Sequence, residues 1–206
     1  MLTTPGSANW VALREVFRVF QQGETRPQLQ EYRGKRWQRT EEFAGWIAEQ
    51  SLPSLSLEQV LSLYSASGGK HRKDFKGNSI QDIRESLDFL LFDTLPLESR
   101  FQECAAEYGA YQLAGAGKEL VSYLLCLRDP ILFAVWNLNA KKVLRKLRMP
   151  IETLKKGPVG VGYLNLLEDL AILRHWLGMP DFRAVDEFCY TVTRPGPRKS
   201  TVIGHG

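Results

Sequence analysis

Two glycines ahead of an apolar run are the strongest candidates for chemistry in this chain. The segment LAGAGKELVSYLL, residues 113–125, places Gly115 and Gly117 just before Lys118. Small residues before a helix let backbone N–H groups approach a phosphate. A P-loop needs GxxxxGK[ST] after a strand, and a dinucleotide-binding turn needs GxGxxG after a strand. Here the spacing differs, Leu120 stands at the third glycine position, and no strand pattern precedes, so both of those sites are excluded.

Residues that usually carry catalysis or bind metals are sparse and badly spaced. The three histidines form no HxxxH or HExxH pattern, and the three cysteines are far apart and odd in number. These six residues are His71, His175, His205, Cys104, Cys126 and Cys189. We expect no metal site, no disulfide framework and no catalytic residue, and buried thiols in a reducing cytoplasm.

The elements that must position the glycines are helices, because apolar residues recur three and four apart almost throughout. No alternating strand pattern of useful length appears, so the sequence predicts an all-α fold. We expect an N-terminal helical part (1–66), a helical core (78–194) and a disordered tail (195–206), forming one compact unit. Between the first two parts, residues 65–78 (SASGGKHRKDFKGN) have no periodicity and predict a long loop. A helix ending near Tyr111 and another beginning near Lys118 should enclose the glycines.

Positive charge is concentrated locally although the net charge is only +4. The cations lie in the segment 68–77, in the window 141–156 and in the tail 194–199. Such clusters are compatible with nucleic acid, although a solvated helix face is the better explanation of any one of them taken alone. No apolar run approaches the ~20 residues that cross a bilayer, and the N-terminus lacks a secretory pattern. We therefore expect a cytoplasmic protein without membrane contact.

Residues 113–147 resemble the helix-hairpin-helix DNA glycosylases related to endonuclease III. Those proteins carry a hairpin of the form LPGxGxKTA, an apolar helix, a segment with a catalytic Asp, and a basic helix. Leu113, Gly115 and Gly117 match the hairpin, and AVWN (134–137) stands where the catalytic segment would be. The match covers roughly a sixth of the chain, at moderate specificity.

The resemblance implies a helix-hairpin-helix core that holds DNA phosphate on hairpin backbone, with a positive φ expected at Gly117. It implies DNA as the partner, and no cofactor except a monovalent cation that hairpin carbonyls can hold. The DNA-binding residues expected are Gly115, Gly117, Lys118, Lys141, Lys142, Arg145, Lys146, Lys70, Arg72 and Lys73. Trp136 and Asn137 are base-pocket candidates, with a core position for Trp136 and a helix cap for Asn137 as the alternatives.

The sequence departs from that family at the positions that carry its chemistry. Glu119 occupies the place of the nucleophilic Lys, and Asn137 the place of the catalytic Asp. We therefore expect DNA binding without base excision, in a prokaryotic repair, restriction or phage-defence system. Two alternatives stay open: a divergent glycosylase or lyase that uses Lys118 or Asp129, and a helical subunit that binds another protein.

Overall fold

The computed structural model describes residues 7–23, 26–149 and 157–194, and within these ranges every regular element is a helix. The all-α class is confirmed. The expected disordered tail, 195–206, lies outside the described residues. Among the described helices, none combines the length and the hydropathy that a membrane crossing requires.

The helices of the described residues follow one another along the chain in a fixed order. They are α1 (Ser7–Gly23), α2 (Pro27–Arg36), α3 (Thr40–Trp46), the 3₁₀ turn η1 (Glu49–Ser54), α4 (Leu57–Ala66), α5 (Arg72–Lys76), α6 (Ile80–Phe92), α7 (Leu97–Ala105), α8 (Lys118–Arg128), α9 (Leu138–Lys146), α10 (Val159–Leu177) and α11 (Phe182–Thr193).

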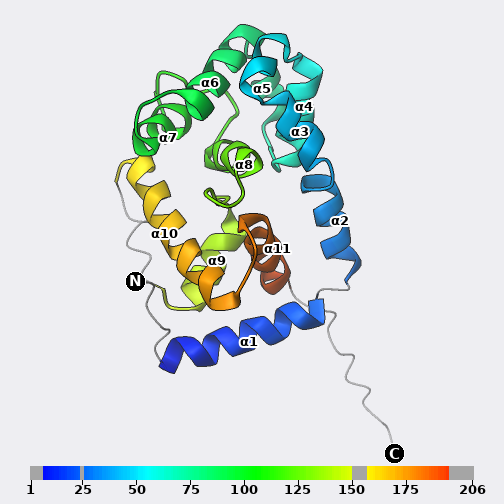
Figure 1. The fold of residues 1–206 in the computed structure, drawn as a ribbon, viewed down its shortest axis with the longest axis vertical. Coiled ribbons are helices and arrows are strands. Elements are labelled where there is room, and N and C mark those ends of the chain that lie inside the picture. The colour runs from blue at the N-terminus through cyan, green and yellow to red at the C-terminus, as the bar shows by residue number, and fades with distance from the viewer. Residues whose placement is uncertain (1–6, 24–25, 150–156, 195–206) are drawn as a thin grey trace, which may run out of the picture.

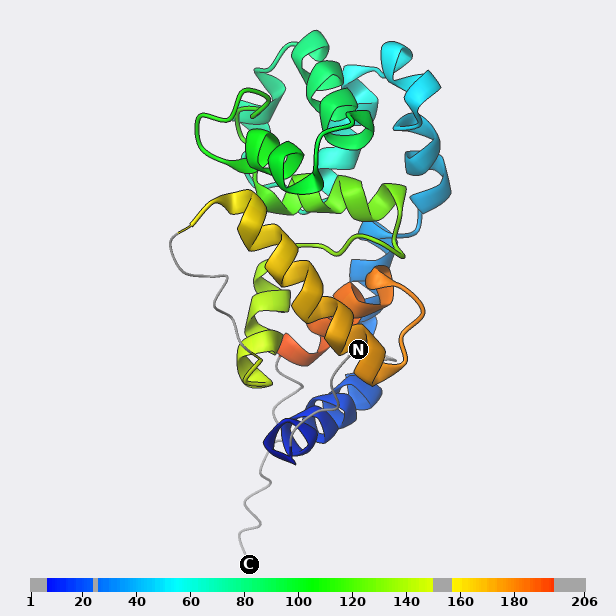
Figure 2. The same ribbon diagram turned by 60° about the vertical axis from the view of Figure 1, so that its left-hand side comes forward.

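Helix α8 is the central element. In Figures 1 and 2 it lies between an upper group, α3 to α7, and a lower group, α9 to α11. Every residue from Leu120 to Leu127 is buried, and all of them except Ser122 are apolar or aromatic. The N-terminal helices reach both groups: α1 and α2 pack against α11, while α3 packs against α8. The position of α8 in the core therefore fixes where its N-terminus points.

Local signals set several helix starts as the sequence indicates. Ser79 caps α6 by accepting from the Asp82 N–H at 3.0 Å, and Asn137 caps α9 by accepting from the Ala140 N–H at 2.9 Å. Capping of α9 was one of the two roles expected for Asn137, and it is confirmed.

Two expectations about the connections are wrong. The loop expected at 65–78 contains the end of α4 and the short helix α5, whose Phe75 stacks on Tyr64 with ring centroids 4.2 Å apart. The helix expected to end near Tyr111 stops at Ala105, because Tyr111 turns back to donate to the Glu103 carbonyl. Residues 106–117 then form turns, so the structure does not show two helices joined directly by the GAG turn.

Candidate functional site

Gly115 is required by packing inside the protein. Its φ is +71°, and a Cβ at this position would lie 2.7 Å from both the His71 carbonyl oxygen and the Phe75 nitrogen. The Tyr64 hydroxyl stabilises this turn by donating a hydrogen bond to the Gly115 carbonyl at 3.0 Å. The Asn78 side chain both donates to the Ala114 carbonyl and accepts from the Ala114 N–H. The carbonyls of Ala114 and Gly115 thus both accept hydrogen bonds from side chains.

Gly117 is different, because it is exposed and its neighbourhood is open. It is the N-cap residue of α8 with an extended φ of −147°, so the positive φ expected here is wrong and belongs to Gly115. A Cβ at Gly117 would meet no atom within 4 Å, and no side chain caps the first turn of α8. The N–H groups of this turn therefore face outward at the positive end of the helix dipole.

Two lysine ammonium groups lie over the Trp136 ring beside this helix start, and Arg145 follows Lys141 one turn later on α9. The Lys118 ammonium lies 4.6 Å from the centre of the Trp136 ring, and the Lys141 ammonium lies 5.4 Å from the same centre. Partial burial lowers the pKa of Lys141, and the charges of Lys118 and Arg145 lower it further. Among the described residues, none of the three cations forms an ion pair. The structure thus gathers Lys118, Lys141 and Arg145, which we call the α8 cation cluster.

The other two basic residues of α9 lie on a different stripe. Lys142 and Lys146 are four residues apart and turned about 100° from Lys141 and Arg145. Lys146 lies toward α1, where the pKa of Glu15 is lowered mainly by Arg18 and slightly by Lys146. The four cations expected to form one track are therefore divided into two.

Of the cations expected in the 65–78 segment, Lys70 alone lines the glycine turn. It borders a pocket of about 370 Å³ between residues 68–71 and 115–120. Arg72 turns back onto α4, where its guanidinium donates to the Ser65 hydroxyl at 2.7 Å. Lys73 is exposed on α5. The hairpin pocket, as we call it, is also lined by Glu119, by four glycines and by the residues Tyr64, Ser67, His71, Ala116 and Leu120.

A buried polar cluster lies beneath the helix start, and sequence reasoning missed it. Arg36, only 3% exposed, has a guanidinium nitrogen 3.3 Å from a Glu119 oxygen and its Nε 3.1 Å from an Asp186 oxygen. The Nε contact is an electrostatic pairing without the alignment of a hydrogen bond. Asp186 also accepts from the Tyr32 hydroxyl at 2.7 Å and the Trp37 indole at 3.1 Å. The cluster therefore links α2, α8 and α11.

The charges of this cluster set its protonation. Burial alone would lower the pKa of Arg36, but Asp186 in particular raises it above its ordinary value, so the guanidinium stays charged. Burial raises the pKa of Glu119 above its ordinary value, and Arg36 partly offsets that shift. Glu119 is thus a carboxyl held between a buried cation and an open pocket.

Both base-pocket candidates are buried. The Asn137 side chain donates to an Asp186 oxygen at 2.7 Å in addition to capping α9, so both ends of its amide are engaged. Trp136 is 4% exposed and packs near the rings of Phe101 and Tyr163. In this structure Trp136 serves the core and Asn137 serves the cap, and neither side chain is open to a base.

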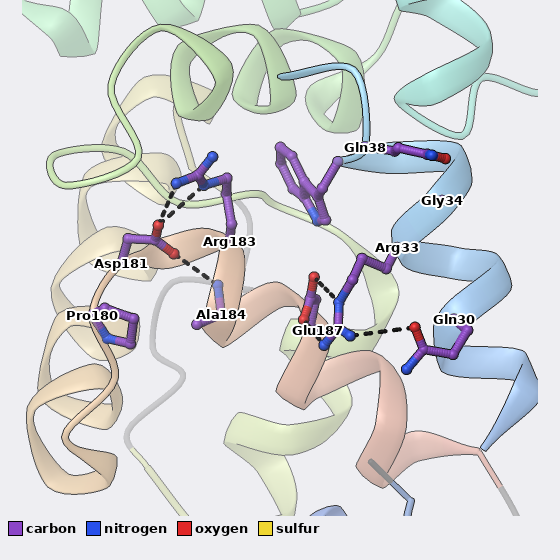
Figure 3. A pocket seen from close by; sticks show the side chains of 10 residues that line it. Gln30, Arg33, Gly34, Gln38, Pro180, Asp181, Arg183, Ala184 and Glu187 are labelled. Atoms are coloured by element: carbon purple, nitrogen blue, oxygen red, sulfur yellow. Dashed lines mark hydrogen bonds and ion pairs between the residues drawn. The ribbon is translucent and has the colours of Figure 1, made fainter. Parts of the chain in front are cut away.

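A larger pocket lies elsewhere, between α2 and the start of α11 (Figure 3), with a volume of about 620 Å³. Its arginines are matched by acids: Arg33 pairs with Glu187 at 2.6 Å, and Arg183 pairs with Asp181 at 2.8 Å. It contains none of the residues singled out from the sequence. The balanced charge makes it a poorer phosphate site than the start of α8.

Neither a metal site nor a similarity to a known protein identifies a function for this chain. Within the described part of the chain, no group of three His, Cys, Asp or Glu side chains is placed to hold a metal ion. All three cysteines are buried and free. No family model matches the sequence, and neither a curated protein nor a solved structure matches it.

Proposed function

We propose that this protein binds DNA through the phosphate backbone at the start of α8, without excising bases. The observation that carries this proposal is the α8 cation cluster beside an uncapped helix N-terminus at Gly117. Three neighbouring cations without an acidic partner repel one another, and a bound phosphate relieves that repulsion. Helix N–H groups and ammonium groups together are a common phosphate site.

The same geometry supports binding without base excision. An excision reaction of the resembled kind needs a carboxylate near the sugar or a lysine that attacks it. Asn137 is neutral and buried, with both ends of its amide hydrogen-bonded, and Glu119 carries no amine. The proposed setting is a prokaryotic repair, restriction or phage-defence system in the cytoplasm, which rests on the resemblance of residues 113–147.

The two stripes of α9 provide a test with an internal control. We expect Lys141→Ala with Arg145→Ala to weaken DNA binding and to reduce the slope of log affinity against log salt by about 1.8, if each cation meets one phosphate. Lys142→Ala with Lys146→Ala removes the same charge from the same helix, and should change the slope by less than half as much. Fluorescence anisotropy with a duplex oligonucleotide across a salt series measures both.

The outcome also separates the alternatives. Equal slopes for the two double variants would contradict a site at the α8 cation cluster. No measurable DNA affinity of the unchanged protein at low salt would favour the protein-binding alternative. Borohydride trapping of a protein–DNA adduct through Lys118 would establish the lyase alternative, and we expect no such adduct.

A further inference from the structure

The hairpin pocket adjoins the proposed phosphate site and differs from it in chemistry. Glycine backbone at Gly68, Gly69, Gly115 and Gly117 forms part of its walls, and the side chains of Tyr64, Ser67, Lys70, His71, Ala116, Glu119 and Leu120 form the rest. Packing requires glycine at position 69, because a Cβ there would lie 2.2 Å from the Tyr64 ring. A molecule in this pocket would touch the same first turn of α8 that faces the proposed phosphate.

Glu119 determines which chemical group fits in the pocket. Its side chain is 38% exposed, and one of its oxygens lies 3.3 Å from Arg36. The other oxygen receives no hydrogen bond from any described residue. A carboxylate accepts hydrogen bonds and repels phosphate, so its neighbour in a complex should be a neutral donor. The charged or titratable groups around it are Arg36, Asp186, Lys70 and His71.

These two features together select a particular part of a DNA strand. A nucleotide whose phosphate lies on the start of α8 can place its sugar in the hairpin pocket, next to Glu119. In an uninterrupted strand that sugar carries a second phosphate on its 3′ side, which would face the carboxylate. At the end of a strand the sugar carries a free 3′-hydroxyl instead, which can donate to the carboxylate.

We propose that the hairpin pocket binds the 3′-terminal nucleoside of a DNA strand, with Glu119 accepting a hydrogen bond from the free 3′-hydroxyl. This inference rests on the proposed function, because the phosphate at the start of α8 positions the sugar. It makes nicks and strand ends the preferred sites of binding.

The test uses one DNA minicircle in several states. The probes are the covalently closed circle and the same circle with a single nick that ends in a 3′-hydroxyl, a 3′-phosphate or a 3′-deoxy sugar. We expect the 3′-hydroxyl nick to bind about 10- to 100-fold more tightly than the closed circle, as a hydrogen bond to a charged group provides. The 3′-deoxy and 3′-phosphate nicks should lose this gain, the phosphate most completely.

A variant links the preference to Glu119. Glu119→Gln keeps an oxygen acceptor and removes the charge, so it should keep the preference for the 3′-hydroxyl nick and weaken discrimination against the 3′-phosphate nick. Glu107→Gln changes an exposed acid in the connection before α8, and should leave both preferences unchanged. Unchanged discrimination in Glu119→Gln would overturn the role of Glu119.

The remaining outcomes separate this inference from the proposed function. Equal affinity for closed and nicked circles would overturn the inference and leave backbone binding intact. No binding to any circle at low salt would overturn both. Displacement of the 3′-hydroxyl nick by thymidine 5′-monophosphate, at the concentrations that bind the nick, would assign the pocket to free nucleotides and refute the strand-end reading.

Discussion

Replacing Asp186 by Asn tests whether the buried cluster beneath α8 holds the fold together. Asp186 accepts from Tyr32, Trp37 and Asn137, and it lies 3.1 Å from the Arg36 guanidinium. Asp186→Asn preserves the shape and removes the charge. Arg36 then stays buried with Glu119, at 3.3 Å, as its remaining ion-pair partner.

The structure sets the size of the effect. Breaking a buried ion pair by removing one partner typically costs about 3–5 kcal/mol of unfolding free energy. Glu119 still compensates part of the Arg36 charge, so we expect the low end of that range, about 3 kcal/mol. For a chain of this size, such a loss lowers the melting temperature by about 6–12 °C.

Thermal unfolding followed by far-ultraviolet circular dichroism measures the change, and a neighbouring acid provides the control. Glu187 is on the same helix and pairs with Arg33, whose side chain is 40% exposed. Glu187→Gln should cost less than about 1 kcal/mol, as partly exposed pairs do. If Asp186→Asn melts within 2 °C of the unchanged protein, or no lower than Glu187→Gln, the cluster does not carry the stability assigned to it.

Two further predictions concern the helix start and a buried acid. Gly117→Asp should leave the melting temperature unchanged or raise it, because Asp is a favourable N-cap residue. The same variant should weaken DNA binding, because it places a carboxylate where the phosphate binds. Gly117→Ser introduces a neutral cap and should retain most of the affinity in the same anisotropy assay. Equal affinity of the two variants would contradict phosphate binding at this turn. Burial raises the pKa of Asp169 from 3.8 to about 6, so the folded state binds its proton more tightly, and the associated stability is lost as pH rises from about 4 through 6. Asp169→Leu should therefore raise the free energy of unfolding by about 1–2 kcal/mol at pH 8, after discounting for solvent screening, and by less at pH 4.5. An increase in melting temperature that does not depend on pH would refute a raised pKa at Asp169.

Helix starts were predictable from sequence because their signals are local. Ser79 and Asn137 each lie three residues before the N–H group that they cap, so the pattern is visible in a short window. The apolar run of α8 indicated a buried helix for the same reason. The all-α class follows from the sum of such signals along the chain.

The end of α7 depends on contacts that the apolar periodicity does not show. Apolar spacing continues through Tyr108 and Tyr111, which favoured a longer helix. The backbone instead turns at Tyr108, which has a φ of 64°, and Glu103 holds the returning chain through both its carbonyl and its carboxylate. A Cβ on Gly109 would lie 2.2 Å from the Glu103 carbonyl oxygen, so this glycine permits the return.

The glycine motif was located correctly, but its two residues could not be told apart from sequence. Gly115 has the positive φ because α5 packs against it, and α5 comes from a segment that shows no periodicity. Gly117 is free of such contacts. A tertiary contact between segments about 40 residues apart makes Gly115 necessary for the fold and leaves Gly117 open to a ligand. Patterns within a short stretch of sequence do not contain such a contact.

The buried cluster accounts for the residue types at positions 119 and 137. Glu119 and Asn137, which stand at the positions that resemble the catalytic ones, both contact the Arg36–Asp186 pair, from opposite ends. An amine at position 119 would face the buried Arg36 guanidinium, and a carboxylate at position 137 would face the Asp186 carboxylate. Each would place like charges against each other at low dielectric. Arg36 therefore favours an acid at position 119, at the start of α8, and Asp186 favours a neutral donor at position 137, at the start of α9.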